Sequence, residues 1–235
     1  FLGPDQRHGF HTRIAGDVSS YTHPGAGRGP NFVNIDPAGC GQSAACVRVA
    51  GPGHSNYKAY DDRVRDACND FLTERGSGQS EEPMLLVTGF VLPHCPFIAP
   101  KELYDYYYEN LPMPEMPEGY LDGLPEPMRL WRESRGVHEL TDEEIRRARA
   151  GYYGTVEYFD SIIGNLLETL DESGMADDTI VVYVSDHGES AGENGLWWKS
   201  NFYEHGAGVP MIWSAPGTLP EGERRGEAVS LLDLG

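Results

Sequence analysis

The chain has 235 residues, of which 39% are hydrophobic and 11% aromatic. This length and composition fit a folded domain with a sizeable core rather than a disordered polypeptide. Its 37 acidic and 18 basic residues give a net charge of −19, which argues against binding to nucleic acid or to an anionic membrane surface, because both attract Lys and Arg. No apolar run approaches the roughly 18 residues of a membrane-spanning helix. Composition assigns neither a compartment nor an oligomeric state.

The four cysteines, Cys40, Cys46, Cys68 and Cys95, contain no C-x-x-C pair, so neither a zinc ribbon nor a thioredoxin-type motif is expected. Cys40 and Cys46 lie in a loop rich in Gly, Ala and Ser, where they could form a disulfide. So few cysteines in a chain of this length do not identify a redox compartment, and free thiols are expected.

The first 56 residues are rich in Gly, Pro, Asn and His and have little periodicity, which predicts a long irregular segment with turns. Apolar residues at helical spacing then predict a helix over 57–74. Met84–Phe90 is an apolar run suited to a buried strand. Two prolines stiffen the turn that follows this run and hold His94 beyond the strand.

A short aromatic helix is predicted over 100–110, and the five prolines among residues 111–136 predict a surface excursion. Two further apolar runs, 180–184 and 209–214, predict strands.

One long helix is predicted in the second half of the chain. Thr141 and Glu144 have the spacing of a capping box, in which each side chain accepts from the other residue's backbone. From Ile145 to Leu170 apolar residues recur every three or four positions. This pattern predicts a helix of roughly 30 residues, with Gly174 at its C-terminal cap. Strands that alternate with long helices predict an α/β fold, a sheet flanked by helices.

In such sheets functional groups gather beyond the carboxyl ends of the strands. Asp186 and His187 directly follow the strand predicted at 180–184, and His94 follows the earlier strand. Lys199 comes twelve residues after His187, behind two tryptophans. A carboxylate and an imidazole can both bind a divalent cation, and an ammonium can bind an anion. The pattern therefore suggests a metal site that handles an anion.

Each of these residues also has a structural explanation. Asp186 and His187 can belong to an ordinary turn, because Asp and Gly are common turn residues, and two ligands are too few for a metal site. Lys199 can be a surface lysine that lies over aromatic rings. His94 can act as a proton donor or be a hydrogen-bonded structural histidine. The spacing alone does not decide among these possibilities.

Several segments resemble a known family. Ser185-Asp186-His187-Gly188-Glu189, the run Gly192–Lys199, Tyr203-Glu204 and Val209-Pro210 are similar to the C-terminal signature of type I sulfatases, members of the alkaline-phosphatase superfamily. The choline-sulfatase and iduronate-sulfatase branches are especially similar. Pro93-His94-Cys95-Pro96-Phe97 matches the family's His-x-Pro-Phe segment.

The resemblance implies an alkaline-phosphatase-like sheet flanked by helices and the hydrolysis of a sulfuric ester. Asp186 and His187 would be ligands of a divalent metal, usually Ca²⁺, with Mg²⁺ or Mn²⁺ as alternatives. Lys199 would bind a non-bridging sulfate oxygen, and His94 would contact the ester and assist the leaving group. The molecule bound and hydrolysed would be a small-molecule or carbohydrate sulfate ester.

One departure from the family is serious. The family's nucleophile is a formylglycine made in a Cys/Ser-x-Pro/Ala-x-Arg motif, and neither Cys40-Gly-Gln-Ser-Ala nor Cys46-Val-Arg-Val-Ala fits it. The N-terminal Asp-Asp metal ligands are absent as well. We therefore expect residues 1–235 to be a fragment of a sulfatase catalytic domain that lacks the N-terminal nucleophile region and the C-terminal subdomain. The alternatives are a phosphonate monoester or phosphodiester hydrolase of the same superfamily, and a degenerate, non-catalytic binding protein.

Overall fold

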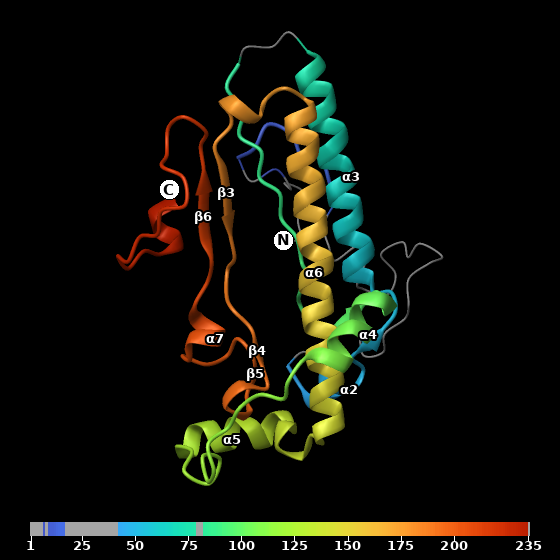
Figure 1. The fold of residues 1–235 in the computed structure, drawn as a ribbon, viewed down its shortest axis with the longest axis vertical. Helices are drawn as coiled ribbons and strands as arrows, with labels where there is room; N and C mark the ends of the chain where they lie inside the picture. Colours follow the sequence, from blue (N-terminus) through green and yellow to red (C-terminus); the bar gives the residue numbers. More distant parts are fainter. Residues whose placement is uncertain (1–6, 8, 17–41, 79–81, 235) are drawn as a thin grey trace.

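A computed structural model describes residues 7, 9–16, 42–78 and 82–234 of the chain. Figure 1 shows that the long helix α6 (Asp142–Glu172) forms the axis of the molecule, with α3 (Asn56–Ser77) packed beside it. The pair of strands β3 and β6 runs along the other side of α6 in this view, and the shorter elements gather near its N-terminal half. The other α-helices of the described residues are α2 (Ala44–Arg48), α4 (Lys101–Asn110), α5 (Glu126–Arg135) and α7 (Glu204–Ala207).

The strands of the described residues form three separate two-stranded sheets. β1 (Gly51–Pro52) pairs in parallel with β2 (Ile98–Ala99). β3 (Val181–Val184) pairs antiparallel with β6 (Met211–Ser214), and β4 (Ser190–Ala191) with β5 (Trp197–Trp198). The mixture of helices and strands agrees with the predicted α/β class, and the strands predicted at 180–184 and 209–214 are confirmed as β3 and β6.

Helix α6 begins and ends as predicted. The Thr141 hydroxyl accepts from the Glu144 backbone N–H at 3.2 Å, and the Glu144 carboxylate accepts from the Thr141 N–H at 2.9 Å. The second of these bonds stabilises the charged carboxylate and, with the charge of Arg48, lowers the pKa of Glu144. Gly174 follows the helix with φ +73°, a left-handed conformation that glycine adopts at low cost. The predicted helices at 57–74 and 100–110 are confirmed as α3 and α4.

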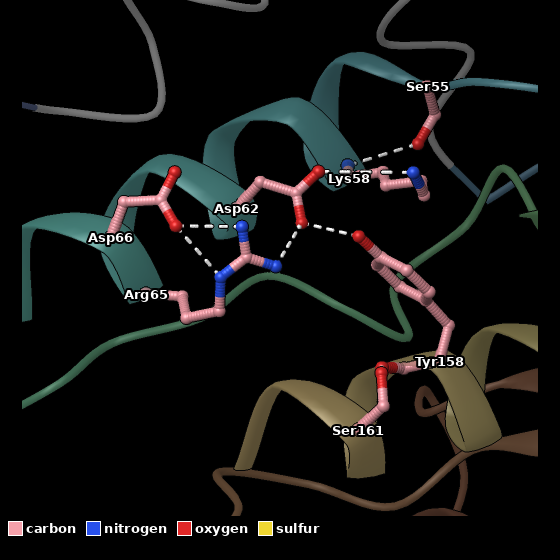
Figure 2. Close-up of polar contacts among 7 residues, drawn as sticks. All are labelled: Ser55, Lys58, Asp62, Arg65, Asp66, Tyr158 and Ser161. Carbon is pink, nitrogen blue, oxygen red and sulfur yellow. Dashed lines mark hydrogen bonds and ion pairs between the residues drawn. The ribbon is translucent and has the colours of Figure 1, made fainter. Parts of the chain in front are cut away.

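Two helices are joined by a network of charged side chains, shown in Figure 2. Asp62 of α3 accepts a hydrogen bond from Arg65 at 3.0 Å and another from the Tyr158 hydroxyl of α6. Lys58 lies 3.8 Å from the same carboxylate, and its ammonium lies over the Tyr158 ring. These contacts fix the face of α3 that meets α6.

The main core lies where α6 meets the segments that carry the predicted site. Phe97, Trp197 and Trp198 are fully or almost fully buried there, together with Ala148 of α6. Helix α6 approaches Phe97 closely at Gly151, where a Cβ atom would lie 2.2 Å from the Phe97 carbonyl oxygen. Only glycine permits this approach.

The strand predicted at Met84–Phe90 is wrong, because no strand is assigned between residues 83 and 91. A strand needs a hydrogen-bonded neighbour, and no described segment pairs with this run. Leu85 and Val87 are 77% and 64% exposed instead of buried. The run is held at its end, where Phe90 packs edge-on against Phe159 of α6 with ring centroids 5.3 Å apart.

Three further expectations need correction. The surface excursion at 111–136 contains helix α5, because Pro125 is its N-cap residue and Pro127 lies in its first turn, where a missing N–H costs nothing. Cys46 is disulfide-bonded, so the expectation of free thiols is wrong for Cys46. It is confirmed for Cys68 and Cys95, which are buried. Within the irregular segment predicted for residues 1–56, α2 and β1 are regular, and most of the rest, including Cys40, lies outside the described residues.

Two glycines of α6 provide a matched test of this packing. Gly151→Ala should lower the free energy of unfolding by about 1–3 kcal/mol, the usual cost of forcing extra atoms into a packed core. Gly164→Ala, on the same helix but with no atom within 4 Å of the added Cβ, should raise it by about 0.5–1 kcal/mol. Urea unfolding of both variants measures the difference. Equal stabilisation by both substitutions would contradict the close approach at Gly151.

Candidate functional site

His94 lies in a turn whose two X-Pro peptide bonds, Leu92-Pro93 and Cys95-Pro96, are both cis. The Nδ1 atom of His94 lies 2.6 Å from the Cys95 carbonyl oxygen. Because a carbonyl only accepts, this contact assigns the proton of the neutral ring to Nδ1. The Nε2 atom therefore carries a lone pair and is available to a ligand.

Asp186 and His187 lie in the turn that follows β3. The Ser185 hydroxyl donates to the His187 carbonyl at 2.9 Å and closes the turn. The Gly188 N–H donates to the Gly206 carbonyl at 3.0 Å. A side chain at position 188 would meet the His205 carbonyl oxygen at 2.2 Å, so glycine is required for this contact. The start of α7 thus supports the turn that carries Asp186 and His187.

Lys199 directly follows β5, and its position is set by the two preceding tryptophans. Trp197 and Trp198 are each 1% exposed, so they belong to the core and do not lie on a surface beneath the lysine. Lys199 itself is half-buried. Lys199 therefore extends from the end of a hairpin, β4–β5, whose two tryptophans are buried in the core.

A buried ion pair ties this hairpin to α6. Arg149, 6% exposed, donates to the Ala191 carbonyl at 2.6 Å and to the Glu193 carboxylate at 2.5 Å. Burial raises the pKa of Glu193, but the bond from Arg149 and backbone donors outweigh it, so the pKa lies below its ordinary value. The helical spacing of apolar residues predicts that Arg149 lies on α6. It does not predict the partner of Arg149, because Glu193 lies 44 residues further along the chain.

The pKa of His94 lies below its ordinary value. Burial lowers the pKa of His94; the Cys95 carbonyl opposes this shift, whereas the charges of Lys199 and His187 add to it. The charge of Asp186 acts in the opposite direction. His94 is therefore neutral at neutral pH in the absence of a bound anion.

Glu189 is a member of this group that sequence analysis missed. Burial raises its pKa to about 8, against the charge of Lys199 and a backbone hydrogen bond from Trp198. Its Oε1 atom is buried without a hydrogen-bond partner among the described residues. A carboxyl that is mostly protonated at neutral pH leaves the positive charge of Lys199 uncompensated.

Comparisons with known proteins identify the family. The family model described as Sulfatase matches residues 5–235. The chain belongs to the sulfatase family. It is 32% identical over 235 residues to the choline-sulfatase of Rhizobium meliloti (strain 1021), covering 94% of this chain and 44% of that protein. It is 35% identical to iduronate 2-sulfatase of Homo sapiens over 158 residues, 60% of this chain and 29% of that protein.

A solved structure supports the same fold. The phosphonate monoester hydrolase SpPMH from Silicibacter pomeroyi has a TM-score of 0.50 and 29% identity, covering 66% of this chain and 34% of that one. The expected alkaline-phosphatase-like fold is thereby confirmed. The chain spans less than half the length of each of these relatives.

The donors at Asp186 and His187 fit part of a metal shell in a protein of the sulfatase family. The Asp186 carboxylate is 83% exposed, and its Oδ1 atom lies 3.6 Å from Nε2 of His187. Nδ1 of His187 contacts the Gly188 carbonyl at 2.8 Å, which leaves the Nε2 lone pair on the side of Asp186. A metal-binding histidine commonly has its other nitrogen held by a carbonyl in this way. In the described part of the chain no cluster of at least three possible metal ligands occurs, so a metal at this pair would need further ligands.

None of the described helices is long and apolar enough to span a membrane.

The buried pair of Arg149 and Glu193 gives a pH-dependent prediction. Because the folded pKa of Glu193 is lowered, the pair's stabilisation is complete above the unfolded pKa of about 4.3 and is lost as the pH falls through the folded pKa. Glu193→Gln should lower the free energy of unfolding at neutral pH by about 3–5 kcal/mol, because Arg149 is left buried without a counter-charge. Urea unfolding at neutral pH and in acid should show a deficit that shrinks in acid.

The matched control is Glu168→Gln, an exposed carboxylate of α6. It should leave the unfolding free energy almost unchanged at either pH. A deficit for Glu193→Gln that is the same at both values of pH would contradict the role of its charge.

Proposed function

We propose that the protein to which these residues belong hydrolyses a sulfate ester, and that this chain carries part of its active site. The observation that supports the proposal most strongly is the match of the Sulfatase family model to residues 5–235, which include His94, Asp186, His187 and Lys199. The packing of Phe97, three residues after His94, against Trp197, two residues before Lys199, gives it geometric support. An ammonium, a neutral imidazole and a pair of metal-type donors are the groups needed to bind and neutralise an anionic ester.

His94 serves as the group that assists departure of the alcohol. Its Nδ1–H is held by the Cys95 carbonyl, so Nε2 is the atom available to the ester. A sulfate group bound beside it adds negative charge, which raises the pKa of the imidazole. Nε2 then holds a proton that can be given to the leaving oxygen, as general acid catalysis requires.

Lys199 binds a non-bridging oxygen of the sulfate group. Its ammonium donates hydrogen bonds and carries a full positive charge, and the neighbouring carboxyl of Glu189 is kept mostly protonated by burial. Asp186 and His187 hold a divalent cation, Ca²⁺ in our proposal, with Mg²⁺ and Mn²⁺ as alternatives. A bound cation supplies additional positive charge for the transferring group, and the formylglycine nucleophile is expected in the part of the protein beyond this chain.

The substrate is a small-molecule or carbohydrate sulfate ester. The similarity to a phosphonate monoester hydrolase keeps phosphonate monoesters and phosphodiesters as the second candidate class, because Lys199 and a divalent cation would bind any of these anions. The similarity to sulfatases covers more of the chain, and for this reason sulfate is the first choice.

The partial site leads to a direct prediction for activity. The 235-residue chain alone should not hydrolyse an aryl sulfate, because no formylglycine motif occurs in it. The longer polypeptide encoded by the same gene should contain a Cys/Ser-x-Pro/Ala-x-Arg motif and should hydrolyse sulfate esters faster than matched phosphonate esters. Turnover by the 235-residue chain alone would contradict the partial site, and a longer polypeptide without the motif would support a non-catalytic protein.

The scarcity of lysine allows a clean test of Lys199. The chain has only three lysines, Lys58, Lys101 and Lys199. In the longer polypeptide Lys199→Ala should lower kcat/KM by about 10²–10³-fold, the usual loss on removing one donor that stabilises an oxyanion. Lys101→Ala, which removes the same charge from the exposed surface of α4, should leave kcat/KM within about twofold. Similar rates for Lys199→Ala and the unmodified enzyme would exclude the assigned role.

A further inference from the structure

The turn that carries His94 is held from α3 by a buried carboxylate. Asp61 is 0% exposed and accepts hydrogen bonds from the Val91 N–H at 2.9 and 3.1 Å and from the Leu92 N–H at 2.8 Å. These bonds fix the backbone two and three residues before His94.

Among the described residues, the Asp61 carboxylate forms no ion pair and bonds only to the backbone N–H groups of Val91 and Leu92. Burial raises its pKa to about 7 in spite of these bonds, and the nearby charge of Asp62 adds to the increase. Burying a carboxylate without a counter-ion opposes folding, so this residue costs stability that an apolar residue would not.

One turn earlier on the same helix, Tyr57 contacts the imidazole itself. Its ring meets the ring of His94 edge to face, with centroids 5.5 Å apart and planes at 82°. Residues four apart lie on the same face of a helix, so Tyr57 and Asp61 together form a support for the turn. Tyr57 limits the rotation of the ring, and Asp61 limits the movement of its backbone.

The start of α3 is itself fixed relative to this turn. Gly51 and Pro52, shortly before the helix, pair with Ile98 and Ala99, shortly after the turn. The Ser55 hydroxyl caps α3 by accepting from the Lys58 N–H at 3.1 Å. Sheet and helix therefore place Tyr57 and Asp61 at a defined distance from His94.

We propose that Tyr57 and Asp61 are positioning residues that hold the His94 imidazole in its Nδ1–H tautomer with Nε2 facing the site. They touch neither substrate nor metal and act through His94. The proposal rests on the function proposed above for His94, but the orientation of the ring can be measured without any turnover.

The test is a long-range ¹H–¹⁵N NMR titration of the chain labelled with ¹⁵N-histidine. The signals of His94 are assigned by their absence in His94→Gln. In the unsubstituted chain we expect a neutral Nδ1–H ring whose pKa lies below about 6.5. Asp61→Asn and Tyr57→Leu should each populate the Nε2–H tautomer and move the pKa upward, toward about 6.5, because the freed ring gains access to water.

Each substitution has a matched control. Asp62→Asn removes the same charge from the adjacent residue, whose carboxylate bonds to Arg65 and Tyr158 instead of to the turn. Tyr57→Phe keeps the ring that meets His94 and removes only the hydroxyl. Both controls should leave the tautomer and pKa of His94 unchanged.

In the longer polypeptide Tyr57→Leu should lower kcat by about tenfold or more, because a small displacement of a catalytic group is costly. KM should change little, since Lys199 is untouched, and Tyr57→Phe should keep full activity.

Unchanged His94 signals in both Asp61→Asn and Tyr57→Leu would overturn the proposal, as would an equal change in Asp62→Asn. If Asp61→Asn does not fold, the comparison of Tyr57→Leu with Tyr57→Phe decides alone. If the longer polypeptide does not hydrolyse sulfate esters, the proposed function is refuted. The NMR experiment still decides whether Tyr57 and Asp61 orient the His94 ring.

Discussion

The site depends on one buried contact, in which Phe97 packs between α6 and the hairpin β4–β5. Phe97 and Trp197 are both almost completely buried, with ring centroids 6.2 Å apart. Phe97 follows His94 by three residues, and Trp197 precedes Lys199 by two. The packing of these rings therefore sets the separation of the histidine and the lysine, although the two lie more than 100 residues apart in the chain. The absence of a side chain at Gly151 allows α6 to close over the contact.

The electrostatics of the site oppose those of the whole chain. A net charge of −19 repels an anionic ester at long range, but screening limits such repulsion to about 8 Å at physiological salt. Within that distance the balance is local. Burial raises the pKa of Glu189 to about 8, so that this carboxyl is mostly neutral beside Lys199, and Arg149 neutralises the charge of Glu193. The positive charge of a lysine thus remains available for an anion inside an acidic protein.

Sequence analysis predicted those parts of the molecule that depend on local patterns. The capping box at Thr141 and the periodicity of α6 are local, and both are confirmed. The run 84–90 has the composition of a buried strand, but a strand exists only with a hydrogen-bonded partner, and composition does not supply one. The prolines at the start of α5 were interpreted as signs of a surface excursion, because their position relative to the helix end decides whether they break it or begin it. His94, Asp186, His187 and Lys199 were found because they lie within family motifs. Asp186 and His187 also follow the confirmed strand β3, whereas the strand predicted before His94 is wrong.

Tyr57 and Asp61, which are proposed to position His94, could not be predicted from local patterns in the sequence. Asp61 and Asp62 are adjacent acids on one helix, and neither composition nor spacing distinguishes them. In an α-helix, successive side chains point about 100° apart around the helix axis. Asp62 therefore contacts Arg65 and Tyr158, whereas Asp61 accepts from the backbone N–H groups of Val91 and Leu92. A cation stabilises a carboxylate from any side, whereas backbone donors do so only when the turn is already in place. Asp61 and the His94 turn therefore stabilise each other's conformation, and neither is defined until α3 and the turn have come together.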